Sequence, residues 1–117
     1  MGEARSGFSK RLLLLLAFLL AGGCASNETL PPAALTYHVL GLTYLNKGQY
    51  AQAIADYNRA LEINPRSALV YTNRAQAHYS LKDYSKAWDD VQKAQELGAK
   101  IDPQFLKDLR EASSREK

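Results

Sequence analysis

The sequence contains a single cysteine, Cys24, so no disulfide bond can form within the chain and no cluster of cysteine ligands can hold a metal ion. No apolar run is long enough to span a bilayer, which takes about 20 residues. The motifs of common enzyme sites are also lacking: there is no HExxH segment, no paired cysteine and no glycine-rich phosphate loop. The two histidines, His38 and His78, are expected on different helices. These absences predict a protein that is not an enzyme and has no metal site and no cofactor.

The chain also lacks a basic cluster. It has 15 Lys and Arg against 12 Asp and Glu, and most of this excess comes from Arg5, Lys10 and Arg11 near its start. Further along, basic and acidic residues are interleaved, as on an ordinary solvated surface. Because a nucleic-acid footprint needs a clustered basic stripe, we predict no nucleic-acid partner.

The start of the chain has the pattern of a secretory signal peptide. The three basic residues precede an apolar run from Leu12 to Ala21, and small residues follow that run. A basic, then apolar, then small-residue order is typical of a leader that is removed during export. We therefore predict a leader over residues 1–23 and leave it out of the fold.

The stretch Leu20-Ala21-Gly22-Gly23-Cys24 resembles the lipobox of bacterial lipoproteins. In that family the leader is cut just before the cysteine, the sulfur carries diacylglycerol, and the new amino terminus often carries a fatty acyl chain such as palmitate. The resemblance implies that Cys24 is a lipidation site. One departure is that Ala21 stands three residues before the cysteine, where leucine is usual.

The resemblance also implies a place in the bacterial cell envelope, with a lipid membrane as partner. Each buried methylene contributes about 0.8 kcal/mol, so one acyl chain binds marginally but two or three on one cysteine hold stably. In bacteria with two membranes, Ala25 after the cysteine implies the outer membrane, facing the periplasm.

Other interpretations of this segment stay open. Ala21 and Gly23 also satisfy the small-x-small rule of ordinary signal cleavage, which leaves Cys24 as a free thiol. The first six residues match a myristoylation pattern, and residues 27–29 match a glycosylation sequon. An exported bacterial leader argues against both of these modifications. Residues 24–33, which are polar and then rich in proline, are predicted to form a lipid-anchored tether.

The clearest signal in the rest of the chain is an internal repeat. A shift of 34 residues superimposes identical residues at many positions, among them Ala34 on Ala68, Leu35 on Leu69, Tyr37 on Tyr71, Tyr50 on Tyr84, Ala53 on Ala87, Asp56 on Asp90, Ala60 on Ala94 and Glu62 on Glu96. This period is typical of the tetratricopeptide repeat. The first unit resembles that family closely, because Tyr37, Leu40-Gly41 and Tyr44 follow its aromatic-x2-Leu-Gly-x2-Tyr pattern.

The resemblance and the apolar periodicity predict an all-α fold. Two helix-turn-helix units, over residues 34–67 and 68–101, are expected to stack as a short right-handed solenoid within a domain over residues 34–112. A capping helix is predicted over residues 102–112, with Asp102 as its N-cap and Pro103 in its first turn. Residues 113–117 are expected to fray.

Spacing also predicts the repeat core. Residues at i, i+3, i+4 and i+7 share one face of a helix, and a glycine at position 41 lets the partner helix approach closely. Pro65 is expected to end the second helix. The predicted repeat core consists of Tyr37, Leu40, Gly41, Tyr44, Ala53, Tyr57, Ala60, Pro65, Tyr71, Ala75, His78, Ala87, Val91 and Ala94.

Solenoids of this family bind other polypeptides in a concave groove that is lined by the first helix of each unit. The residues predicted to line a peptide-binding groove are Leu35, His38, Leu42, Leu45, Thr72, Asn73, Gln76 and Tyr79. The clamp that related proteins use for acidic chaperone tails is not expected, because only Asn73 matches it and His38 and Leu42 depart from it.

The predicted function is a membrane-tethered adaptor for protein–protein interaction that assists assembly of an envelope complex, such as a pilus, a secretin or outer-membrane machinery. Two alternatives stay open. The chain could be a self-associating structural module, and thus a homo-oligomer, because repeat arrays usually need about three units. It could also be an accessory subunit of a cell-wall enzyme.

Overall fold

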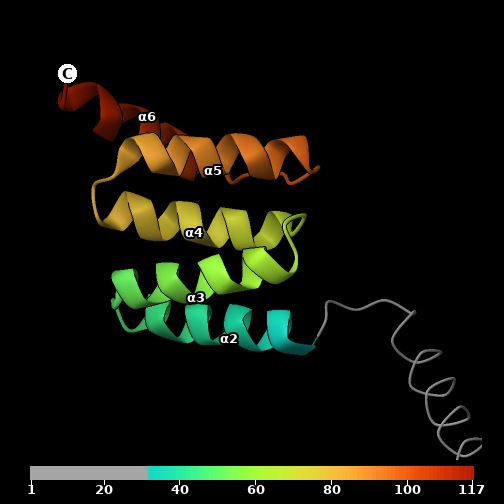
Figure 1. Cartoon of the computed structure of the whole chain (residues 1–117). Helices are drawn as coiled ribbons and strands as arrows, with labels where there is room; N and C mark the ends of the chain where they lie inside the picture. The colour runs from blue at the N-terminus through green and yellow to red at the C-terminus, as the bar shows by residue number, and fades with distance from the viewer. Residues whose placement is uncertain (1–31) are drawn as a thin grey trace, which may run out of the picture. The chain divides into compact units, whose positions relative to one another are not determined.

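The computed structural model describes residues 32–117, and this part of the chain is all-α, without a strand. The helices are α2 (Pro32–Asn46), α3 (Tyr50–Ile63), α4 (Ala68–Ser80), α5 (Tyr84–Glu96) and α6 (Pro103–Arg115). They stack in chain order as successive layers, so each helix lies beside the next one (Figure 1). The stacked helical hairpins predicted from the repeat are confirmed.

The predicted leader, Cys24 and the first part of the tether lie outside the described residues. Within residues 32–117, no helix combines the length and the apolar character that a bilayer-spanning segment requires.

The two hairpins have the same turn, as expected for repeated units. The amide of Gln49 donates to the carbonyl of Tyr44 at 2.9 Å, and the amide of Asp83 donates to the carbonyl of His78 at the same distance. Gly48 adopts a φ of 74° in the first turn, and Lys82, which is 34 residues further on, adopts a φ of 63°. Both turns therefore place one residue in the left-handed region, where glycine is favoured.

Capping side chains mark the starts of α4, α5 and α6. Ser67 accepts a hydrogen bond from the amide of Val70, and Asp83 accepts one from the amide of Lys86. Asp102 accepts from the amide of Gln104 at 3.0 Å, and Pro103 follows it in the first turn of the last helix. At the other end, α2 begins at Pro32, inside the predicted tether, because proline is well suited to a first helical turn.

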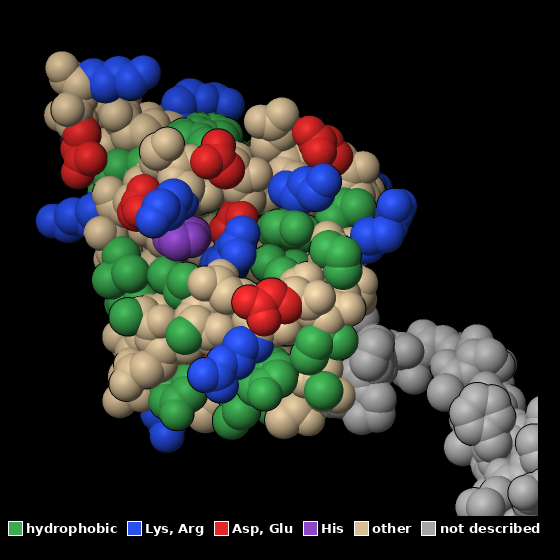
Figure 2. Space-filling view, in the orientation of Figure 1, with side chains coloured by type: hydrophobic (Ala, Val, Ile, Leu, Met, Phe, Trp, Pro, Cys, Tyr) green, Lys and Arg blue, Asp and Glu red, His purple; other side chains and the backbone are tan. Residues whose placement is uncertain are grey.

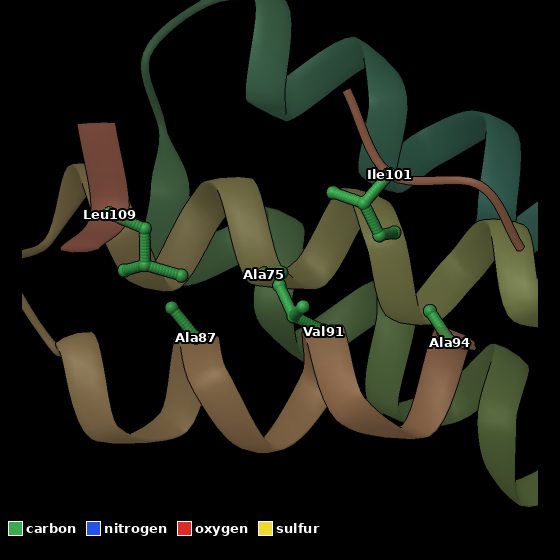
Figure 3. Packing of buried hydrophobic residues seen from close by; sticks show 6 residues of the cluster. All are labelled: Ala75, Ala87, Val91, Ala94, Ile101 and Leu109. Atoms are coloured by element: carbon green, nitrogen blue, oxygen red, sulfur yellow. The ribbon is translucent and has the colours of Figure 1, made fainter. Parts of the chain in front are cut away.

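Two connected hydrophobic clusters form the core. The first lies between α2, α3 and the start of α4 and includes Tyr57, and the second joins α4, α5 and α6 (Figure 3). Tyr71 packs against both clusters and so links the two units. The following predicted core residues are buried: Gly41, Ala53, Tyr57, Ala60, Ala75, His78, Ala87, Val91 and Ala94.

Leu40 and Pro65 are exceptions to the predicted core. Leu40 is 40% exposed, although it occupies the position equivalent to the half-buried Arg74. Pro65 is exposed and follows the end of α3, and its carbonyl accepts a hydrogen bond from the Tyr71 hydroxyl at 3.1 Å. Tyr37, Tyr44 and Tyr71, which we also expected in the core, are half-buried and pack against it.

The last helix runs to Arg115, three residues beyond its predicted end at residue 112. The Trp88 indole nitrogen on α5 donates to the Ser113 hydroxyl at 3.4 Å, and Arg115 pairs with Glu111 at 3.7 Å. These contacts hold the last turn, which we expected to fray.

Candidate protein-binding surfaces

An apolar strip runs along one side of α2. Leu35 and Val39 are 48% and 52% exposed, and Leu42, at the next helical spacing, is half-buried. Leu69, the repeat equivalent of Leu35 on α4, is 59% exposed. Sequence reasoning missed Val39, although its position four residues after Leu35 places it on the same side of the helix. We call Leu35, Val39, Leu42 and Leu69 the apolar strip.

Two residues predicted to line the groove contact each other instead. The side chains of His38 and Asn73 are buried, and the Asn73 amide nitrogen lies 3.0 Å from His38 Nε2. For the amide to donate to it, Nε2 must be the unprotonated ring nitrogen. Burial also lowers the pKa of His38. These two side chains therefore bridge α2 and α4 and are not free to contact a peptide.

The other predicted groove residues differ in their surroundings. Gln76 is exposed, whereas Thr72 is half-buried and its hydroxyl donates to the carbonyl of Ala68 at 2.9 Å. Leu45 packs against the first core cluster. Tyr79 belongs to the packing of the second cluster, where its ring centre lies 5.7 Å from that of Tyr84 and 5.5 Å from that of Phe105. A charge at Tyr79 would disturb the core as well as the surface.

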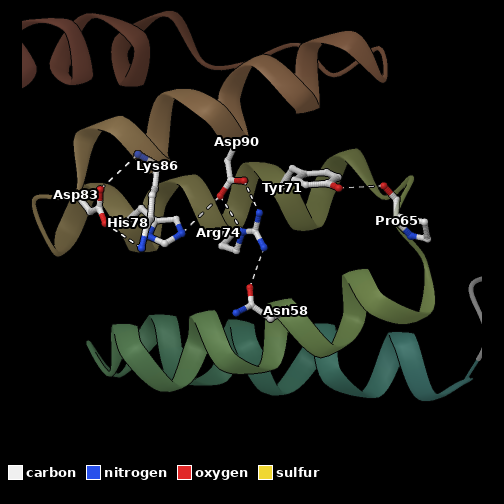
Figure 4. Close-up of polar contacts among 8 residues, drawn as sticks. All are labelled: Asn58, Pro65, Tyr71, Arg74, His78, Asp83, Lys86 and Asp90. Atoms are coloured by element: carbon white, nitrogen blue, oxygen red, sulfur yellow. Dashed lines mark hydrogen bonds and ion pairs between the residues drawn. The ribbon is translucent and has the colours of Figure 1, made fainter.

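A polar network joins the two units (Figure 4). Arg74 on α4 donates to both carboxylate oxygens of Asp90 on α5, at 2.8 and 2.6 Å, and to Asn58 Oδ1 on α3 at 2.8 Å. Its guanidinium also lies 5.4 Å from the centre of the Tyr71 ring. Because Asp90 is only 3% exposed, this bidentate pair neutralises a carboxylate inside the structure. The hydrogen bonds to Asp90 also raise the pKa of Arg74.

A cavity of about 280 Å³ opens beside this network. It is lined by Ile54, Asn58, Arg74, His78, Lys86, Asp89 and Asp90. His78 Nε2 lies 3.8 Å from Asp90 Oδ2, yet burial dominates and lowers the pKa of His78. The polar groups here bond mainly to one another, which favours a structural role.

Charge and apolar surface are distributed unevenly. Figure 2 shows charged side chains of both signs around a histidine over the part formed by α4 and α5, and more hydrophobic side chains toward α2 and α3. In residues 32–117, no three His, Cys, Asp or Glu side chains converge in a way that could hold a metal ion.

Comparison with known proteins agrees with this architecture. Residues 41–82 match a family model described as "TPR repeat". The chain is 32% identical over 74 residues to tetratricopeptide repeat protein 12 of Mus musculus, covering 63% of this chain and 10% of that protein. It is 40% identical over 58 residues to small glutamine-rich tetratricopeptide repeat-containing protein 2 of Saccharomyces cerevisiae, covering 50% and 16%. It is 46% identical over 48 residues to dynein axonemal assembly factor 4 of Pongo pygmaeus, covering 41% and 11%.

The chain thus aligns with a fifth or less of the length of these relatives. The family match over residues 41–82 and the stacked hairpins are consistent with a tetratricopeptide-repeat architecture in this part of the chain.

Proposed function

We propose that this chain is a membrane-tethered adaptor, which binds a segment of another envelope protein along α2 and α4 while lipid on Cys24 holds it at a bacterial membrane. The observation that carries the binding part is the apolar strip. Leu35, Val39 and Leu69 are each about half exposed on the first helices of the two units. Exposed apolar side chains that gather on one surface are typical of an interaction site.

The surroundings of the strip favour a peptide-like ligand. Gln76 is exposed on α4 and offers a donor and an acceptor beside the apolar side chains. The His38–Asn73 bond fixes α2 relative to α4, so the strip is preorganised. We infer that the ligand is an amphipathic helix or an extended segment whose apolar residues contact the strip.

The assembly role is an analogy with the relatives. One of them is named as an assembly factor, and it shares 46% identity with this chain over 48 residues. We infer the membrane anchor from the lipobox-like stretch that ends at Cys24. A short anchored module of this kind would concentrate its ligand at the membrane surface.

Site-specific crosslinking in intact cells would test the binding surface. A photoreactive residue at position 35 or 69 is expected to crosslink to one discrete partner, whereas the same residue at the exposed Gln95 on α5 is not. The double variant Leu35→Glu/Leu69→Glu should lose the crosslinked partner while its circular dichroism and melting temperature stay unchanged. Equal crosslinking from positions 35 and 95, or capture that survives the double variant, would refute the assignment.

The anchor has its own test. The mature protein should carry a diacylglycerol adduct on Cys24, seen as a mass increase by intact mass spectrometry, and Cys24→Ser should abolish both the adduct and membrane sedimentation. An unmodified Cys24 thiol at the mature amino terminus would show ordinary signal cleavage and would remove the tether from the proposal.

A further inference from the structure

The repeat makes it possible to compare each position of the first unit with its equivalent in the second. In the second unit the buried carboxylate of Asp90 is neutralised by Arg74, which lies on the preceding helix of the same unit. The equivalent carboxylate in the first unit is that of Asp56, which is only 8% exposed. The equivalent of Arg74 is Leu40, which carries no charge. The first unit therefore retains the acid and lacks its cation.

Asp56 has no compensating partner in the described part of the chain. No hydrogen bond or ion pair joins its carboxylate to any side chain there, although the residue is more than nine-tenths buried. Its carboxylate oxygens do not belong to the fully buried unpartnered atoms of the described residues, so they keep some contact with solvent. A cation that reaches this recessed carboxylate would form an ion pair that is partly shielded from water.

The surface around Asp56 is the outer side of the first unit. Leu40 is 40% exposed, Ala55 is exposed and Tyr44 is half-buried. These residues correspond to Arg74, Asp89 and His78, which in the second unit face α3 and line the cavity beside it. In the second unit α3 lies beside these positions, although Asp89 stays exposed, and the described residues contain no helix before α2 that could take the place of α3 in the first unit. We call Leu40, Tyr44, Ala55 and Asp56 the end face.

The end face is separate from the apolar strip. Successive residues of an α-helix are turned by about 100°, which places Leu40 and Tyr44 on the opposite side of α2 from Leu35, Val39 and Leu42. A ligand on one surface therefore leaves the other accessible. The apolar character of the α2–α3 end, which is visible toward the bottom of Figure 2, fits a second site.

We propose that the end face docks an amphipathic helix of a partner protein, which carries a Lys or Arg that pairs with Asp56. The occupant is inferred from charge complementarity and from the repeat itself. The structure contains an example of such docking, because α3 packs against α4 and presents Asn58 to Arg74 at 2.8 Å. In that contact α4 carries the cation, Arg74. The end face carries an acid, Asp56, so the docked helix must supply the cation.

The α3 sequence provides a defined probe. A hydrocarbon-stapled peptide of residues 49–64 reproduces α3, the helix that packs against α4 in this structure. Three versions are compared, which carry Asn, Arg or Glu at the position of Asn58. Their affinities for the full chain in lipid nanodiscs are measured by fluorescence anisotropy. The Arg peptide should bind at least tenfold more tightly than the Glu peptide, and the difference should shrink as salt is raised.

Substitutions in the protein then locate the interaction. Asp56→Asn keeps the side-chain shape and should abolish the preference for the Arg peptide. Leu40→Arg introduces the residue that the second unit has at this position. The new guanidinium should pair with Asp56 and so abolish binding of the Arg peptide. Leu35→Glu, on the apolar strip, should change neither result. Circular dichroism confirms that each variant folds; if Leu40→Arg does not, Asp56→Asn alone decides the outcome.

Several results would overturn the proposal. The preference for the Arg peptide could persist in Asp56→Asn, or binding could disappear in Leu35→Glu, which would place the peptide on the strip. Light scattering could reveal a stable dimer that Leu40→Arg dissociates, which would identify a second copy of this chain as the occupant. Loss of partner crosslinking at positions 35 and 69 would by contrast refute the proposed function and leave the end face unaffected.

Discussion

Gly41 on α2 lies directly against the ring of Tyr57 on α3. A Cβ atom added at Gly41 would stand 2.6 Å from Tyr57 Cδ1, closer than side-chain atoms tolerate. Tyr57 is fully buried, so its ring has no room to withdraw. In the second unit the equivalent pair is Ala75 and Val91, both also buried (Figure 3). The equivalent space between the two helices is thus filled by Gly41 and a large ring in the first unit, and by Ala75 and the smaller Val91 in the second.

Gly41→Ala should therefore destabilise the protein by about 1–3 kcal/mol, because the added methyl group overpacks a rigid site. Urea denaturation followed by circular dichroism measures this change. The matched background is Tyr57→Val, which copies the second unit. In the Tyr57→Val background, adding Gly41→Ala should not lower the free energy of unfolding further, because the obstructing ring is gone. An equal cost in both backgrounds would show that Gly41 and Tyr57 are not coupled.

Gly48 and Lys82 occupy equivalent turn positions, and both have positive φ. A residue with a Cβ atom is strained there by roughly 1 kcal/mol, whereas glycine is not. We expect Lys82→Gly to be neutral or stabilising and Gly48→Ala to destabilise the protein by about 1 kcal/mol. Thermal melting would compare the two variants, with the exposed Lys93→Gly within α5 as a control that should be destabilising. A lower melting temperature for Lys82→Gly would contradict the assignment of strain to this turn.

Arg74 neutralises Asp90, so its removal leaves a carboxylate buried and unpaired. We expect Arg74→Leu to lower the free energy of unfolding by about 3 kcal/mol. Arg74→Lys keeps the charge but not the two parallel hydrogen bonds and should have a smaller effect. The double variant Arg74→Leu/Asp90→Leu removes both charges and should recover most of the loss. Chemical denaturation of the unsubstituted protein, Arg74→Leu, Asp90→Leu and the double variant measures the coupling, and additive losses would show that the pair does not act as a unit.

The repeat and its helices could be predicted from the sequence because they depend on local patterns. Alanines recurring every 34 residues marked the close helix contacts, and Gly48 marked the first turn. The end of α6 was placed too early, because the contact between Trp88 and Ser113 joins residues that are far apart in sequence.

The binding surface was harder to predict because it depends on how helices face one another. His38 and Asn73 both fall on first helices, where groove residues are expected, and only their approach across the α2–α4 contact shows that they bond to each other. Leu40 matches a core position of the repeat, but a core position is buried only where another helix covers it. The pairing of Arg74 with Asp90 joins two different helices, so it too becomes visible only once the helices are placed against one another.

The bond between Asn73 and His38 predicts a dependence of stability on pH. Burial lowers the pKa of His38 below its ordinary value of 6.5, and it does the same for His78. Below pH 6.5 the unfolded chain therefore binds protons that the folded chain does not, and the free energy of unfolding falls as the pH decreases toward the folded pKa values. Above pH 6.5 this contribution is fully present. Protonation of His38 Nε2 would also remove the acceptor for the Asn73 amide.

Stability measured by urea denaturation between pH 7 and 5 should accordingly decline toward acid. His38→Gln offers an oxygen that can accept from Asn73 but does not titrate, so it should fold and reduce the slope. His38→Gln/His78→Gln should leave the profile nearly flat above the range in which carboxylates titrate. A slope that is unchanged in the double variant would show that the histidines do not control stability in this range. Asn73→Ala in the unsubstituted chain should cost about 1–3 kcal/mol at pH 7, because it leaves a buried ring nitrogen without its donor.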